Sequence, residues 1–325
     1  MPKLRQNIVT GDWVIIAPER AQRPFEFISR EKVLRPSKKD CLFERRNLSR
    51  AKIPFLPVKA RDVYVIPNKY PAFVTTNKIN LEGGQLYNST ESEGYHEVVI
   101  FKDHNKYPAK LTTAHLAEII DVYRQRYLIH IKDPVVKYVL IIHNHGTAAG
   151  ASIYHPHSQI FASPIIPNSV RRILQGAKAY YHQHRKCAYC EIIRHEQKEK
   201  IRLLKKNRYF TAFCPFASRF PFEMRIVPQK HQSNFEKITP AEVKGFAHIL
   251  REILAKLDKG LKNPPYNFYI HTNAARQPEN SFFHWHLEVV PRLGVWGGFE
   301  LGGGFPIDVI SPEKCANFLR KVRSG

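Results

Sequence analysis

The sequence contains one ordered set of residues twice, and this duplication limits the possible folds more than any other feature. Each copy has a cysteine motif, an Asn-x-Tyr motif, a single histidine and a His-x-His pair: Cys41, NKY from 68, His104 and HPH from 155, then Cys187, NRY from 207, His231 and HWH from 284. His155 follows His104 by 51 residues, and His284 follows His231 by 53. A repeat of this length predicts two similar structural units in tandem.

The segments between these motifs predict the same kinds of element in both copies. The runs EVVIF, YVLIIH, FEMRIV and FYIH have the β-rich composition of strands. Helical stretches are expected near 112–130 and 240–258, and Thr239 with Glu242 forms a capping-box motif before the second one. The segment RRILQGAKAYYHQHRK is expected to form a bridging helix between the copies.

These elements predict an α+β fold. We expect two tandem units, each a mainly antiparallel sheet with packed helices, over residues 1–170 and 171–325.

The net charge of +23 favours anionic partners such as nucleotides, sugar phosphates or nucleic acid. The basic residues are spread along the chain, as on an ordinary solvated surface. A nucleic-acid-binding protein stabilised by zinc would cluster lysine and arginine with stacking aromatic residues. Here the motif-bearing loop is built of Gly, Ser, Asn and His, so we do not expect nucleic acid to be the partner.

No apolar run approaches the roughly 20 residues of a membrane helix, and the N-terminus MPKLRQNIVTGDW lacks an apolar signal core. We therefore expect no membrane association and a cytoplasmic location. Cysteines stay reduced there, so a cysteine pair more often marks a metal site than a disulfide.

The second copy predicts a zinc site. Cys187 and Cys190 would supply two soft ligands from one tight turn, and His231 with one histidine of the HWH pair would complete a tetrahedral set. The alternative is a reduced, partly buried cysteine pair without metal.

The first copy predicts a mixed site, because Glu44 stands where the second copy has a cysteine. Cys41, Glu44, His104 and His155 form the candidate ligand set. The alternative is that this unit has lost its metal and that its histidines form hydrogen bonds with neighbours.

The two histidines of the HPH pair are expected to share a strand face but to differ in role. If His155 binds metal, His157 remains a neutral imidazole, which is a good nucleophile near pH 7. The small-residue loop at 146–152 would let backbone N–H groups and the Ser152 hydroxyl approach a phosphate. Gln159 shares the face of His157 and would donate to a non-bridging oxygen. A core histidine near a turn is the alternative.

The HWH pair lacks both the glycine loop and the following glutamine. We therefore expect the second copy to be structural, with His284 as its metal ligand.

The segment NHGTAAGASIYHPHSQIFASP resembles the galactose-1-phosphate uridylyltransferase family of the histidine-triad superfamily. The segments TGDWVIIAPERAQRPFEF, HWHLEVVPR and GGFELGGG extend this resemblance over nearly the whole chain. The resemblance implies that each unit has a histidine-triad-like fold. It also implies a double displacement, in which His157 attacks the α-phosphate of a nucleotide sugar and a second sugar 1-phosphate, or phosphate, takes the nucleotidyl group.

The resemblance also assigns residues. It places His155 at a zinc-ligand position with Cys41 and His104, and Glu300 where a glutamate touches the hexose. The remaining substrate positions are Arg20, Arg23, Asn68, Asn144, Gly150, Ser152 and Gln159. Many members are homodimers whose active sites lie at the subunit interface, so a homodimer is expected.

Two related activities remain open. After Asn68 the uridylyltransferases carry Asp-Phe, whereas this chain has Lys69 and Tyr70. NxYPA and GGFELGxG resemble the plant-type ADP-glucose phosphorylases, which transfer adenylyl to phosphate and whose second zinc site matches Cys187, Cys190, His231 and His284. We expect uridylyl transfer from UDP-glucose to galactose 1-phosphate, with adenylyl transfer as the alternative. An inactive duplicated scaffold is a third reading, against which the intact set of Ser152, His157 and Gln159 argues.

Overall fold

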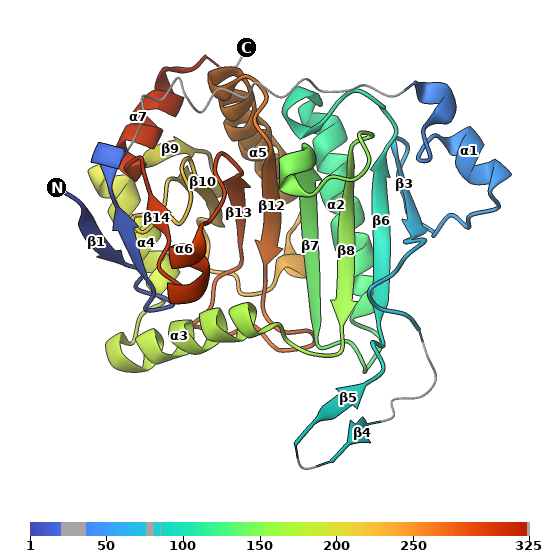
Figure 1. Cartoon of the computed structure of the whole chain (residues 1–325), viewed down its shortest axis with the longest axis horizontal. Helices are drawn as coiled ribbons and strands as arrows, with labels where there is room; N and C mark the ends of the chain where they lie inside the picture. The colour runs from blue at the N-terminus through green and yellow to red at the C-terminus, as the bar shows by residue number, and fades with distance from the viewer. Residues whose placement is uncertain (21–36, 76–80, 85, 324–325) are drawn as a thin grey trace.

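The computed structural model describes residues 1–20, 37–75, 81–84 and 86–323. The predicted α+β class is confirmed, since helices pack on a large antiparallel sheet (Figure 1). The strands of this nine-stranded sheet are, in spatial order, β3 (Val63–Pro67), β6 (Tyr95–Phe101), β8 (His157–Ser163), β7 (Tyr138–His145), β12 (Tyr266–His271), β13 (His286–Pro291), β11 (Met224–Pro228), β10 (Phe210–Phe213) and β9 (Leu203–Lys206).

The two copies share this one sheet rather than forming two separate sheets. Strand β7 of the first copy pairs with β12 of the second, and Asn144 lies opposite Asn267 in that ladder. On either side of this junction the strands follow the same order, β7-β8-β6 and β12-β13-β11. The pairing supplies hydrogen-bond partners to two strand edges that would otherwise be exposed. The expectation of a separate sheet in each unit was therefore wrong, because each unit contributes about half of one shared sheet.

Helices α2 (Thr113–His130) and α5 (Pro240–Leu261) pack against each other and cover one face of the sheet (Figure 1). The predicted capping box is present at the start of α5, where the Thr239 hydroxyl accepts from the Glu242 N–H and the Glu242 carboxylate accepts from the Thr239 N–H. Buried side chains from both copies, among them Tyr123, Phe246 and Trp285, form one continuous hydrophobic core. The two halves thus share a core as well as a sheet.

The opposite face is covered unequally. Over the second copy lie a small sheet of β1 (Lys3–Gln6), β2 (Trp13–Ile16) and β14 (Ile307–Asp308), helix α6 (Gly298–Gly303) and the predicted bridging helix, α3 (Asn168–His184) (Figure 1). In the described part of the chain, no α-helix crosses in front of β6 and β8 in this view.

The remaining elements lie around this frame. They are α1 (Arg45–Arg50), α4 (Ala188–Glu199), α7 (Pro312–Lys321), the hairpin of β4 (Leu81–Gly83) and β5 (Asn88–Thr90), and the 3-10 turns η1 (Pro18–Arg20), η3 (Lys38–Asp40), η4 (Pro108–Lys110), η5 (Thr147–Ala149) and η6 (Phe235–Lys237).

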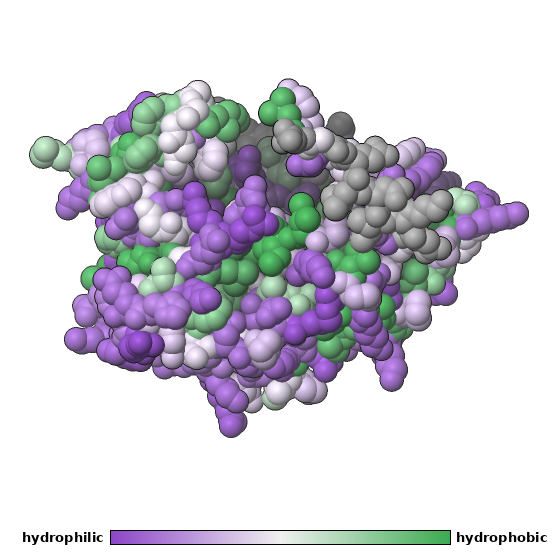
Figure 2. Space-filling model, turned by 90° about the horizontal axis from the view of Figure 1, so that it is seen from below, coloured by the Kyte–Doolittle hydropathy of each residue, from purple (hydrophilic) through white to green (hydrophobic). Residues whose placement is uncertain are grey.

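Hydrophilic residues dominate the face shown in Figure 2, with smaller hydrophobic patches between them. None of the helices in the described ranges combines the length and apolar character needed to span a bilayer.

Candidate catalytic and metal-binding sites

Four side chains of the second copy meet in one compact group: Cys187, Cys190, His231 and His284. The two cysteines come from the start of α4 rather than from a tight turn, since Cys187 is its N-cap and Cys190 lies in its first turn. The Cys190 sulfur lies 3.4 Å from His231 Nδ1 and 3.7 Å from His284 Nδ1. Neighbouring ligand atoms around tetrahedral zinc are about 3.3–3.8 Å apart. The spacing therefore fits zinc.

The hydrogen bonds of this group prepare it for a cation. His231 donates from Nε2 to the Asn280 carbonyl at 2.7 Å, which leaves the Nδ1 lone pair facing the sulfurs. The hydrogen bond from Cys190 lowers the pKa of the Cys187 thiol, although burial opposes the shift. The neighbouring Cys187 sulfur in turn raises the pKa of Cys190. A bound cation would let both sulfurs be thiolates.

The first copy has a matching group of Cys41, His104 and His155, all buried. His155 Nδ1 lies 3.5 Å from the Cys41 sulfur and 3.2 Å from His104 Nδ1. His155 donates from Nε2 to the Phe101 carbonyl at 2.6 Å, so its Nδ1 presents a lone pair to the group. This arrangement also fits zinc, with the outer ring nitrogen fixed by a backbone carbonyl.

Glu44 stands at the edge of that group. Its Oε1 lies 3.1 Å from His104 Nδ1 and 3.8 Å from His155 Nδ1. It is less buried than the other three residues and lies outside the compact group that they form.

His157 is the first residue of β8, whereas His155 precedes the strand, and both rings lie against the ring of Phe43. The His157 ring donates from Nδ1 to the His155 carbonyl at 2.9 Å, which places the lone pair on Nε2. Burial lowers the pKa of His157, although that hydrogen bond opposes the shift. The ring is therefore neutral near pH 7, as a nucleophile must be. The backbone of one candidate metal ligand thus orients the candidate nucleophile.

Two amide side chains meet at His96, a residue of the neighbouring strand β6. Gln159 is half-buried, two residues further along β8, and its Oε1 lies 2.8 Å from His96 Nε2. Asn68 follows β3, and its Nδ2 lies 3.1 Å from the same nitrogen. Lys69 and Tyr70, which follow Asn68, are exposed. Sequence reasoning named both amides but missed His96, which joins them.

The small-residue loop reaches the sheet through asparagines. Asn267 donates to the Asn144 Oδ1 at 2.8 Å and to the Ala149 carbonyl at 2.7 Å, so a residue of the second copy holds the loop of the first. Gly150 has φ +82°, a backbone angle that favours glycine. The N–H groups of Gly150 and Ala151 already donate within the turn, so they do not supply the expected phosphate contacts. Ser152 is exposed just beyond them.

The remaining predicted substrate residues lie elsewhere. Arg20 is exposed at the end of η1, and Glu300 caps its own helix α6 by accepting from the Gly297 N–H at 2.9 Å. Figure 1 places η1 and α6 on the side of the second copy, away from β8. Arg23 falls outside the described residues. One chain therefore does not bring Arg20 and Glu300 to His157.

The strand register defines the second-copy equivalent of the His157 site. Val98 lies opposite Gln159, and Arg225 lies opposite Glu288. Glu288 follows His286 by two residues, as Gln159 follows His157. His286 likewise donates from Nδ1 to the His284 carbonyl, at 3.0 Å. The histidine geometry is repeated, but a carboxylate replaces the amide.

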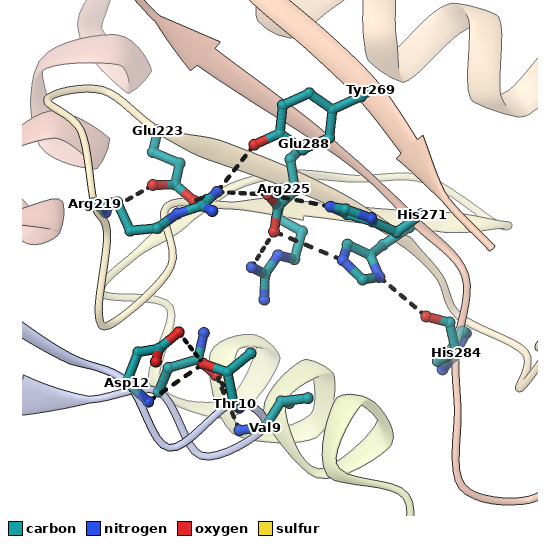
Figure 3. A network of polar contacts seen from close by, with 12 residues as sticks. Val9, Thr10, Asp12, Arg219, Glu223, Arg225, Tyr269, His271, His284 and Glu288 are labelled. Atoms are coloured by element: carbon teal, nitrogen blue, oxygen red, sulfur yellow. Dashed lines mark hydrogen bonds and ion pairs between the residues drawn. The ribbon is translucent and has the colours of Figure 1, made fainter. Parts of the chain in front are cut away.

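That carboxylate is bound by arginines (Figure 3). Arg219 donates to Glu288 Oε2 at 2.7 Å, and Arg225 donates to Oε1. Burial raises the pKa of Glu288, but the two guanidinium groups outweigh it and hold that pKa well below its usual range. Glu288 also groups closely with His271 and His286, yet the adjacent guanidinium charges disfavour a cation there. Across a cavity of about 190 Å³ lies the β1–β2 turn, with Thr10 and Asp12.

Comparison with known proteins supports this picture. Residues 1–167 match the galactose-1-phosphate uridyl transferase N-terminal domain, and residues 170–294 match the C-terminal domain of the same enzyme.

Relatives of both expected activities are similar over their full length. An ADP-glucose phosphorylase of Arabidopsis thaliana is 32% identical over 99% of this chain and 93% of its own. A galactose-1-phosphate uridylyltransferase of Thermotoga maritima is 29% identical over 99% of both chains. The crystal structure of an Arabidopsis thaliana ADP-glucose phosphorylase with bound ADP-glucose superposes with a TM-score of 0.83, at 30% identity over 99% of this chain and 100% of that one. A uridylyltransferase structure gives 0.75, at 27% identity, over 99% and 98% of the two chains. The chain therefore belongs to the galactose-1-phosphate uridylyltransferase family.

Proposed function

We propose that this protein is a nucleotidyltransferase that acts by double displacement through His157. Nε2 of His157 attacks the α-phosphorus of a nucleoside diphosphate sugar, the P–O bond to the sugar phosphate breaks, and sugar 1-phosphate leaves. A second acceptor then attacks the nucleotidyl-histidine and regenerates the neutral ring. The observation that carries the proposal is the hydrogen bond from Nδ1 to the His155 carbonyl, which points the lone pair of a buried, neutral imidazole outward.

The neighbouring side chains have distinct proposed roles. Gln159 donates to a non-bridging oxygen and stabilises charge in the transition state. Asn68, Asn144, Gly150 and Ser152 surround the nucleotide and its phosphates. Arg20, Arg23 and Glu300 act from the partner subunit of a homodimer, which accounts for the distance of η1 and α6 from β8 within one chain. We also propose units spanning 1–170 and 171–325, of which the first carries the chemistry.

Both metal groups are proposed to bind zinc. Cys187, Cys190, His231 and His284 would hold one ion, and Cys41, Glu44, His104 and His155 the other. Zinc supplies structural cross-linking here. In the first unit the ligand His155 also presents its carbonyl to His157, so fixing that ligand fixes the pose of the nucleophile.

The favoured reaction is uridylyl transfer from UDP-glucose to galactose 1-phosphate, the activity for which both matching family models are named. The second candidate is adenylyl transfer from ADP-glucose to phosphate. Lys69 beside Asn68 favours it, because the uridylyltransferases carry Asp at this position and an ammonium group cannot replace that carboxylate as a hydrogen-bond acceptor. The compact group of Cys187 and Cys190 with two histidines points the same way, because it matches the second zinc site of the ADP-glucose phosphorylases.

Intact-mass measurement separates these candidates. The zinc-loaded protein is incubated with UDP-glucose or ADP-glucose, without acceptor, with the free nucleoside as control. A nucleoside monophosphate adduct supports the proposal, and its mass identifies the base. Adding galactose 1-phosphate or phosphate in turn identifies the acceptor that removes it. If no nucleotide sugar gives an adduct, transfer through a nucleotidyl-histidine is ruled out.

A further inference from the structure

His96 is a buried residue of β6 whose ring contacts both amide side chains near the candidate nucleophile. Its Nε2 lies 2.8 Å from Gln159 Oε1 and 3.1 Å from Asn68 Nδ2. On its other side, Nδ1 lies 3.1 Å from the backbone nitrogen of Ala72. The ring stacks on Phe161, with centroids 4.0 Å apart. These contacts leave the ring one orientation.

The backbone of Ala72 determines which nitrogen of His96 carries the proton. A backbone N–H can only donate, so Nδ1 must present a lone pair to it. Burial lowers the pKa of His96, although the Gln159 hydrogen bond opposes the shift, so the ring is neutral near pH 7. A neutral imidazole has one N–H, and here it must be Nε2–H.

This tautomer fixes the amide of Gln159. The Nε2–H group of His96 donates to Gln159 Oε1. If the Gln159 amide were flipped, its NH₂ group would face this N–H group, and two donors cannot form a hydrogen bond. The NH₂ group of Gln159 is therefore turned away from His96 and is available to a ligand on the face that carries His157.

The amide of Asn68 is oriented by a different contact, with the backbone of Tyr70. Its Oδ1 accepts from the Tyr70 N–H at 2.9 Å, so its NH₂ group faces the ring of His96. Because Nε2 is itself a donor, this NH₂ group has no acceptor on the ring. The His96 ring therefore orients only the Gln159 amide.

The second copy changes these positions together. Arg225 corresponds to Val98 in the strand register, so Glu223, two residues earlier, corresponds to His96. Glu288 corresponds to Gln159. Where the amide is replaced, the histidine that would orient it is replaced as well, which ties the function of His96 to that of Gln159.

We propose that His96 is a positioning residue for nucleotidyl transfer, whose Nε2–H holds the Gln159 amide so that its NH₂ group donates to a non-bridging oxygen of the α-phosphate. The inference rests on the proposed function. A donor held in place before the reaction stabilises the charge that builds on phosphate without first reorganising. His96 touches neither the phosphorus nor the nucleophile, so it acts only through Gln159.

Two matched substitutions test this role. His96→Asn keeps an acceptor near Nδ1 for the Ala72 N–H but cannot reach Gln159. His96→Gln places an amide near the position of Nε2 and can donate. In single-turnover assays with UDP-glucose and ADP-glucose, His96→Asn should slow adduct formation about tenfold, less than the roughly hundredfold loss from Gln159→Leu. His96→Gln should retain a rate within about threefold of the native one.

The double variant separates positioning from a general structural effect. If His96 acts through Gln159, His96→Asn combined with Gln159→Leu should be no slower than Gln159→Leu alone. The inference would be overturned if the rate losses of the two single variants multiplied in the double variant, or if His96→Asn had the native rate. In either case, adduct formation by the native protein would leave the proposed function intact. No adduct in the native protein removes the proposed function, and the inference with it.

A measurement on the native protein covers the case in which a variant fails to fold. Nitrogen-15 NMR of histidine-labelled protein, with the His96 signals assigned by their loss in His96→Gln or in a His96→Phe variant, reports the tautomer. A protonated Nε2 supports the inference, and a protonated Nδ1 overturns it.

Discussion

The two copies place a His-x-His pair at equivalent positions of one sheet, yet they surround the second histidine differently. His157 is followed by the half-buried amide Gln159 on a face that no α-helix of the described chain crosses. His286 is followed by Glu288, which is buried and bound by Arg219 and Arg225 beneath the β1–β2 turn (Figure 3). We therefore propose that the same backbone geometry serves chemistry in the first copy and stability in the second.

Removing each second histidine tests this contrast most strongly. His157→Ala should lower turnover by about 10⁴-fold or more, because the nucleophile is lost and the rest of the site cannot replace it. His286→Ala should keep turnover within about threefold while lowering the midpoint of thermal unfolding. Steady-state kinetics and thermal scans of both variants give the comparison. Equal losses of turnover would contradict it.

Exchanging the residues at the next position sharpens the comparison. Gln159→Glu should slow transfer by about 10²–10³-fold, because a donor to the phosphate is replaced by a negative charge. Single-turnover adduct formation measures this effect.

Glu288→Gln is the matched control. It should leave adduct formation within about threefold but lower the free energy of unfolding by about 3 kcal/mol, because the buried guanidinium of Arg225 loses its charged partner. Denaturant unfolding measures this second effect. A Gln159→Glu variant with native rates would show that the amide is not needed.

Removing a ligand from each of the two metal groups should likewise affect catalysis in the first copy and stability in the second. Cys41→Ser should remove about one zinc per chain and slow adduct formation by about 10–100-fold, because His155 no longer holds its carbonyl against His157. Cys187→Ser should also remove about one zinc but should mainly lower thermal stability. Metal analysis, adduct kinetics and thermal scans report these effects. If the native protein binds only one zinc per chain, the site of Cys41 and Glu44 is the one that we expect to lack metal.

The smallest effect concerns the pH dependence of stability in the second copy. Burial raises the pKa of Asp308 to about 7, although hydrogen bonds from the Ile310 N–H and the Ser218 hydroxyl oppose the shift. The unfolded value is about 3.9. The contribution of this proton to stability is therefore full below about pH 4 and is lost as pH rises toward and through 7.

Asp308→Asn should remove that dependence and change the pH 8 to pH 5 difference in unfolding free energy by about 2–3 kcal/mol. Denaturant unfolding at both pH values measures it, and an unchanged difference would contradict the assignment.

The duplicated spacing was enough to predict the fold class, the helices α2 and α5 and the compact group around Cys187 and Cys190. The continuous sheet was not predictable from spacing, because the β7–β12 pairing depends on two strand edges meeting rather than on a local motif. The contribution of Asn267 to the loop of the first copy follows from that junction and was hidden with it.

Residues that act on named site residues were also missed. The strand register places Glu223 at the position of His96. That equivalence requires ladder partners, which a single sequence does not contain. The same holds for Arg219 and Arg225, which reach Glu288 from distant parts of the chain.

The most direct test locates the nucleotidyl group on the chain. The native protein is incubated with UDP-glucose and ADP-glucose, digested without exposure to acid because a phosphoramidate is acid-labile, and mapped by tandem mass spectrometry. The account predicts the group on His157 alone, and none in His157→Ala. A nucleotidyl group on His286, or on both histidines, would contradict the division of roles between the two copies.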